Sequence, residues 1–171
     1  MKPELLLNVK RAGLTEREHR GYIVVVDSNE KLFSAIGNYD TPFYLRSCEK
    51  PFQALPIILS GAFHNFEFSS EELAICSASH TGSDYHINII TGILNKIGLK
   101  EDNLKCGIHA PLDINAKNYL IRKELKATQL HNNCSGKHAG MLAVCMNNKW
   151  DIENYLAFDH PLQVQILEIV K

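Results

Sequence analysis

A predicted helix in the first third of the chain constrains the fold most. Its sequence, LRSCEKPFQALPIILSG (45–61), places apolar side chains at positions 52, 55, 58 and 59 on one helical face. Pro51 suits the first turn of such a helix, where a missing N–H costs little. Ser47 and Lys50 stand at the same helix start, three residues apart, although polar groups are costly to bury unless they are paired. This pair therefore needs a chemical explanation.

Other segments carry similar signals and together predict an α+β protein. Helices are predicted after the capping box of Ser69 and Glu72, from about Ser83 to Gly98, weakly over 118–125, over the apolar part of 131–148, and from 159 onward. Strands are predicted over 6–9, 22–26 and 31–36, the last two forming a hairpin or meander. We interpret His19-Arg20-Gly21 as a turn that enters a strand. Residues 1–171 are expected to form a single domain.

The overall composition excludes several classes of function. Charged residues make up 22% of the chain and the formal net charge is −1, so no nucleic-acid-binding face is expected. No apolar stretch approaches roughly 20 residues, the length that spans a bilayer, and the N-terminus is unlike a secretory signal. The five cysteines are predicted to be reduced thiols, with Cys48 and Cys145 packed as small apolar groups. We therefore expect a cytoplasmic protein without nucleic-acid or membrane partners.

The first candidate site is the pair Ser47 and Lys50. Side chains three residues apart share a helix face, so the amine and the hydroxyl are predicted to reach hydrogen-bond distance. The helix start adds a partial positive charge, which together with desolvation favours a neutral amine that can accept the serine proton. The simpler alternative is a capping serine followed by a solvated lysine. Spacing alone favours this alternative, because S-x-x-K is short and common.

Two polar segments further along supply the remaining candidates. The segment SASHTG (77–82) is a hydroxyl-rich turn, for which a loop with a helix cap is the simpler hypothesis. The candidate zinc ligands are His131, Cys134, Lys137 and His138, to which Cys106 and His109 add weaker ones. A lysine ligand is unusual because it must be deprotonated. Spacing alone favours a buried thiol among capping polar groups, and the segment does not contain a complete structural zinc site.

Taken together, these motifs are much more specific than any one of them. In chain order they are EREHRG (16–21), RSCEKPFQALP (46–56), CSASHTG (76–82), CGIHAP (106–111), LHNNCSGKHAGML (130–142) and HPLQ (160–163). This set resembles the rhizobial-type L-asparaginases, the asparaginase II family, over nearly the whole chain from about residue 8.

The resemblance implies a fold, an activity and a set of site residues. The implied fold is similar to those of serine β-lactamases, penicillin-binding proteins and glutaminases, here as N-terminal strands plus a helical region. The implied reaction is hydrolysis of L-asparagine to aspartate and ammonia at two serine–lysine tandems beside a zinc site. By motif, the catalytic residues would be Ser47, Lys50 and Ser79. The zinc ligands would be Cys134 and Lys137, in place of His138.

The chain also departs from the family pattern. Family members are roughly twice as long, and their second tandem lysine and a further zinc-ligand cysteine, in a D-G-C motif, lie in a half that is not present here. We therefore expect 1–171 to be a partial domain that is inactive alone and pairs with a complementary C-terminal half or forms a homo-oligomer. One alternative is a catalytically silent fragment that only associates with such a half. A weaker alternative is a penicillin-recognising acyl-serine enzyme. Such an enzyme shares S-x-x-K, but this alternative does not explain the segment HNNCSGKHAG.

Overall fold

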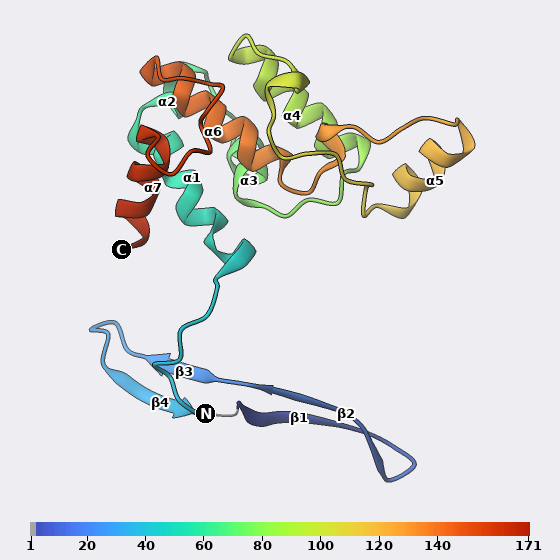
Figure 1. The fold of residues 1–171 in the computed structure, drawn as a ribbon, viewed down its shortest axis with the longest axis vertical. Coiled ribbons are helices and arrows are strands. Elements are labelled where there is room, and N and C mark those ends of the chain that lie inside the picture. The colour runs from blue at the N-terminus through green and yellow to red at the C-terminus, as the bar shows by residue number, and fades with distance from the viewer. Residues whose placement is uncertain (1–2) are drawn as a thin grey trace. The chain divides into compact units, whose positions relative to one another are not determined.

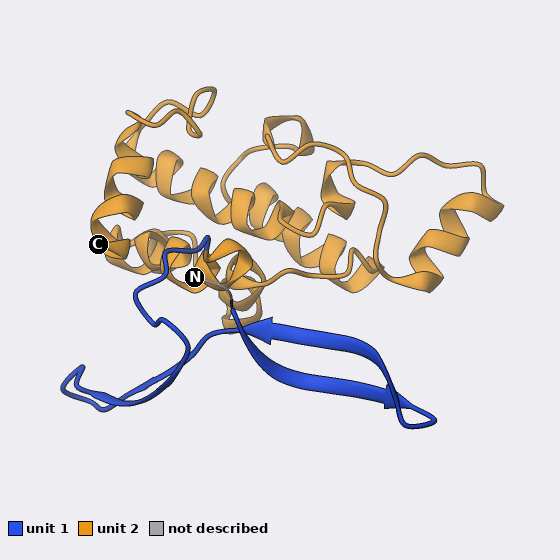
Figure 2. Ribbon diagram, turned by 60° about the horizontal axis from the view of Figure 1, so that its bottom comes forward, with its two compact units in different colours: residues 1–44 blue, residues 45–171 orange. Residues whose placement is uncertain are grey.

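The computed structural model describes residues 3–171, and the chain divides into two compact units, residues 1–44 and 45–171 (Figure 2). The first unit contains strands and the second contains helices. The fold is therefore α+β, as predicted. The strands are β1 (Glu4–Arg11), β2 (Leu14–Gly21), β3 (Ile23–Val26) and β4 (Leu32–Ile36).

The strand unit consists of two separate antiparallel hairpins. β1 and β2 join through Ala12 and Gly13, whose positive φ angles of 47° and 82° suit a tight two-residue hairpin loop. β3 and β4 join through a turn in which the Asp27 carboxylate accepts the backbone N–H groups of Asn29 and Lys31, both at 2.9 Å. The second hairpin confirms the prediction for 22–36.

The strand β2 was missed from the sequence. The segment His19-Arg20-Gly21, predicted as an entry turn, is the end of this strand, and His19 lies opposite Leu7 of β1. The prediction was wrong because LTEREHRG lacks the apolar alternation by which a strand is recognised. Backbone pairing with β1 defines this strand instead. Among residues 3–44, no hydrophobic side chain belongs to the buried core.

The helical unit contains the predicted helices in their predicted order, together with a short helix, α2, that was not predicted (Figure 1). Its helices are α1 (Lys50–Leu59), α2 (Ala62–Asn65), α3 (Ser70–Ser77), α4 (Asp84–Lys96), α5 (Ile114–Arg122), α6 (Ser135–Asn148) and α7 (Pro161–Val170). Short 3₁₀ turns cover Arg46–Glu49, Glu101–Asn103 and Gln129–His131. The predicted capping box of α3 is present, with Ser69 and Glu72 bonding each other's backbone N–H. None of the helices described here has the length and apolar character to cross a membrane.

Helix α6 is the centre of the helical unit and contacts α1, α3 and α4 (Figure 1). Residues 135, 136 and 138–145 of this helix are buried. The core around it includes Ile57, Ile75, Ile90, Ile93, Leu142 and Leu162. The prediction that Cys145 packs as a small apolar group is confirmed, whereas that for Cys48 was wrong because this thiol is exposed. All five thiols are free, as expected.

The start of α6 packs directly against the end of α3. A Cβ atom added to Gly136 would collide with the backbone carbonyl of Ile75, and one at Gly140 would lie 2.9 Å from the Cys76 sulfur. Only glycine allows so close an approach of two backbones. This contact brings the polar segment before α6 beside the residues that follow α3.

Gly136→Ala is expected to lower the free energy of unfolding by about 1–3 kcal/mol or more, because the added methyl meets backbone that cannot rotate away. Gly92→Ala is the matched control. Its methyl would lie 3.8 Å from the Glu72 carboxylate, and alanine should stabilise the interior of α4 by up to about 1 kcal/mol. Urea unfolding of both variants measures the effect. Equal midpoints for the two variants would contradict the close approach.

Candidate active site

The Lys50 amine is the centre of the candidate site. Lys50 is only 3% exposed, although its side chain ends in a polar amine. Its Nζ donates to the Ser79 hydroxyl at 2.7 Å, to the Ala78 carbonyl at 3.0 Å and to the Asn133 carbonyl at 3.4 Å. Three acceptors match the three donors of an ammonium group, which is how a buried amine avoids an unpaired charge.

These three acceptors come from two segments that are distant in sequence. Ala78 and Ser79 follow the end of α3, and Asn133 precedes α6. The close packing at Gly136 brings the two segments together, so Lys50 from α1 meets both. The site is thus assembled where one helix ends and two helices begin.

The structure places Ser47 differently from the prediction. Ser47 lies in the 3₁₀ turn Arg46–Glu49 and is exposed. Within residues 3–171 its hydroxyl makes no hydrogen bond to Lys50, whose amine turns toward Ser79 instead. The α-helix begins at Lys50, whose amine bonds Ser79 and the carbonyls of Ala78 and Asn133, so the predicted bond between the Ser47 and Lys50 side chains does not form. The catalytic roles of Ser47, Lys50 and Ser79 stay predictions.

A second buried pair lies directly beside Ser79. His80 is 3% exposed, and its Nε2 lies 2.9 Å from the hydroxyl of Ser135, the first residue of α6. Its Nδ1 accepts the Gly82 backbone N–H at 3.1 Å. Burial, with smaller contributions from the nearby His86 and Lys50, lowers the pKa of His80 to about 4. His80 is therefore neutral near pH 7.

The predicted zinc ligands Cys134 and Lys137 lie at the start of α6, at its N-cap and in its first turn. Burial lowers the pKa of Lys137, as does Lys50, while Cys134 opposes this shift. Cys106 is a neighbour of both: burial raises its pKa to about 11, Cys134 also raises it, and Lys137 lowers it. The Asn132 side chain holds the two segments together, donating to Cys106 O at 2.8 Å and accepting Cys134 N–H at 2.9 Å.

The described residues contain no group of three or more His, Cys, Asp or Glu side chains that could hold a metal ion. Of the two other histidines in the polar segment, His131 uses Nδ1 to accept the backbone N–H and hydroxyl groups of Thr128. Cys134, Cys106 and Lys137 remain as possible donors, and their charges affect the pKa values of Cys106 and Lys137. Thiolate and a deprotonated amine are chemically suited to zinc.

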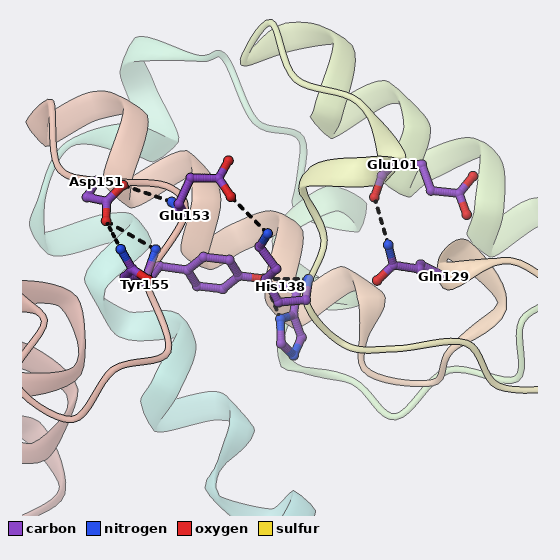
Figure 3. A network of polar contacts seen from close by, with 8 residues as sticks. Glu101, Gln129, His138, Asp151, Glu153 and Tyr155 are labelled. Carbon is purple, nitrogen blue, oxygen red and sulfur yellow. Dashed lines mark hydrogen bonds and ion pairs between the residues drawn. The ribbon is translucent and has the colours of Figure 1, made fainter.

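His138 belongs to a separate polar network (Figure 3). Its Nδ1 lies 2.7 Å from the Tyr155 hydroxyl, which accepts the backbone N–H of Lys105 at 2.9 Å. The Tyr155 hydroxyl therefore bridges His138 of α6 and the backbone at Lys105. Burial, with smaller contributions from Lys137 and Lys50, lowers the pKa of His138 to about 3. The network ties α6 to the loop that follows it.

Several partners in the site were not foreseen from the sequence. The carbonyls of Ala78 and Asn133 are main-chain groups, so no residue type signals them. The link from His80 to Ser135 was also missed, because the two residues are 55 positions apart in the sequence. In the sequence, the close packing of α6 against α3 was indicated only by the small and polar residues at the start of the segment 131–148.

In this α+β protein a buried lysine amine bonds a serine hydroxyl, which is the pairing of base and nucleophile that a serine–lysine hydrolase requires. The family model for L-asparaginase II matches residues 7–171, and the chain is thus a member of the L-asparaginase II family. A search of curated proteins found no match.

Proposed function

We propose that this chain supplies a serine–lysine site for the hydrolysis of L-asparagine to aspartate and ammonia. The observation that carries the proposal is the 2.7 Å hydrogen bond between Lys50 and Ser79, in a member of the L-asparaginase II family. Family membership supports asparagine as the substrate. The bond supports a nucleophilic mechanism, because a hydroxyl needs a base within such a distance to become reactive.

The surroundings of Lys50 suit proton transfer in both directions. Two of its protons are directed to the carbonyls of Ala78 and Asn133, which only accept hydrogen bonds. The third position of the nitrogen therefore faces Ser79. In the neutral amine this position is a lone pair that accepts the serine proton, and in the ammonium form it is an N–H that returns a proton to the leaving ammonia.

The proposed reaction proceeds through an acyl-enzyme. The serine oxygen attacks the side-chain amide carbon of asparagine and gives its proton to Lys50. The C–N bond then breaks, and the amide nitrogen leaves as ammonia after protonation by Lys50. Water then hydrolyses the ester and releases aspartate. Ser79 is the serine that Lys50 contacts, while Ser47 is the serine that the family resemblance pairs with it. Both are candidates for the nucleophile.

We further propose that the complete active site includes residues outside this chain, in a fold similar to that of serine β-lactamases. The resemblance requires a second lysine and a D-G-C cysteine. The chain joined to the residues that carry these two groups is called the completed enzyme below. Ammonia release from L-asparagine by this enzyme, and by its Lys50 and Ser79 variants, tests the proposal. Residues 1–171 alone are expected to be inactive, since catalytic groups that act as a unit fail together.

Zinc is proposed as the cofactor, held by Cys134 and Lys137. The lowered pKa of Lys137, caused mainly by burial, supports this assignment because a lysine ligand must lose its proton. When bound, zinc would act as a Lewis acid that polarises a carbonyl group. Lys50 and Ser79 would carry out the proton transfer and the attack.

Zinc should bind weakly or not at all to residues 1–171 alone, because Cys134 and Lys137 provide only two of about four usual ligands. In the completed enzyme, Cys134→Ala should abolish zinc retention after dialysis against a chelator. Cys48→Ser, which changes an exposed thiol, is the matched control and should retain the metal. Cys106→Ser tests whether the neighbouring thiol contributes. Stoichiometric, chelator-resistant zinc in residues 1–171 alone would contradict the proposed incompleteness.

A further inference from the structure

A buried chain of hydrogen bonds connects the Ser79 turn to the start of α6. It runs from the Gly82 backbone N–H to His80 Nδ1 (3.1 Å), from His80 Nε2 to Ser135 Oγ (2.9 Å), and from Ser135 Oγ to the Leu130 carbonyl (2.9 Å). Ser135 is fully buried and His80 nearly so. None of these groups contacts Lys50 in the hydrogen bonds described above.

The donor at one end of this series of hydrogen bonds and the acceptor at the other determine which atom donates in each bond. The Gly82 N–H can only donate, so His80 Nδ1 is an acceptor and the proton of the neutral ring is on Nε2. The Leu130 carbonyl can only accept, so the Ser135 hydroxyl donates to it and accepts from His80. Because all three bonds are satisfied in this one arrangement, His80 cannot accept a further proton without losing a bond. It is not a base for Ser79.

The two side chains in this series of hydrogen bonds lie next to the partners of Lys50 in the sequence. His80 follows Ser79 directly, and Ser135 lies two residues after Asn133. The bond between His80 and Ser135 therefore fixes the separation of the two segments that supply the three acceptors of the amine. The turn has a further anchor, because the Thr81 carbonyl accepts the Asp113 N–H at 2.8 Å. Within residues 3–171, only the His80–Ser135 bond joins this turn to α6 through side chains.

We propose that His80 and Ser135 are positioning residues, which hold the Ser79 hydroxyl on the Lys50 amine through the His80 Nε2–Ser135 Oγ bond. This inference rests on the proposed function, since it assigns both residues to the same serine–lysine site. Their effect is on geometry: a shift of the turn relative to α6 would move Ser79 and the Ala78 carbonyl away from Lys50 together. Misplacement of a catalytic group by about 1 Å is enough to cost about 10²-fold in rate.

Two substitutions at His80 separate this role from simple support of the core. The glutamine amide can donate from near the position of Nε2 and keep the bond to Ser135, whereas the shorter asparagine reaches only the Gly82 side. In the completed enzyme, His80→Gln should keep kcat for asparagine within about threefold, and His80→Asn should lower it by about tenfold or more with little change in KM. Equal losses in the two variants, per folded protein, would overturn the proposal.

Ser135→Ala removes the acceptor directly and should reproduce the loss seen with His80→Asn. His86→Gln is the matched control, because this ring stacks on His80 at 5.3 Å but bonds Ser83 within its own helix start, and it should retain normal kcat. Normal kcat in Ser135→Ala would also overturn the proposal, and if that variant does not fold, the His80 pair decides. Failure of the proposed function is distinguishable, because Lys50→Met and Ser79→Ala would then retain activity whatever the His80 variants do.

Discussion

Lys50→Met in the completed enzyme is expected to lower ammonia release from L-asparagine by about 10²-fold or more, the effect of removing an acid–base group. Methionine fills a similar volume but leaves the Ser79 hydroxyl without its base and the carbonyls of Ala78 and Asn133 without a donor. The steady-state rate of ammonia release, per folded protein, measures the loss. Lys117→Met, at an exposed position in α5, is the control and should have normal activity.

Serine substitutions then identify the nucleophile. Ser79→Ala should cause a loss similar to that of Lys50→Met, because the two groups form one hydrogen-bonded pair. The family resemblance implies a comparable loss for Ser47→Ala. Full activity in Ser47→Ala would leave Ser79 as the nucleophile, and full activity in Ser79→Ala would remove it from the mechanism. Near-normal activity in Lys50→Met would exclude the serine–lysine mechanism altogether.

The second large effect is expected on stability, which should fall steeply as the pH drops from about 6.5 toward 4. The pKa of His80 is lowered to about 4 and that of His138 to about 3 in the folded protein, from an ordinary value near 6.5. In this window the unfolded chain binds both protons and the folded protein binds neither. The free energy of unfolding should therefore rise with pH, with a slope approaching about 2.7 kcal/mol per pH unit for two protons.

Urea unfolding of the completed enzyme at several pH values between 4 and 7 measures this dependence. His80→Gln removes one of the two buried imidazoles and should reduce the slope by about half. His64→Gln replaces an exposed histidine and should leave the slope nearly unchanged. A free energy of unfolding that is flat from pH 7 to 4 would show that the two buried rings are protonated as easily as in the unfolded chain.

Local signals in the sequence were sufficient for most helices. The start of α3 was predicted because Ser69 and Glu72 interact within four residues of each other. The last helix was predicted from 159, two residues before α7 begins at Pro161 after its cap, His160. For α5 the prediction began too late, since the cap is Asp113, whose carboxylate accepts the Ala116 N–H at 2.8 Å. Interactions confined to a few residues leave a pattern that can be recognised.

Interactions between distant segments could not be predicted in this way. β2 depends on pairing with β1, and its own polar sequence contains no period of two. Lys50 was predicted to pair with Ser47, three residues before it, but the serine that its amine bonds is Ser79, 29 residues away. Family resemblance identified the motif around Ser79 but not the bond, because a motif carries residue types and not distances.

Two of the three partners of Lys50 are main-chain carbonyls, and this has a consequence for protein engineering. The orientation of the amine depends on the path of the backbone at positions 78 and 133, and the side chains there contribute none of the bonds to the amine. Substitutions at these two positions can therefore alter the shape and polarity beside Ser79 while the Lys50 amine keeps its carbonyl partners. A library that seeks altered substrate preference would begin with these two positions.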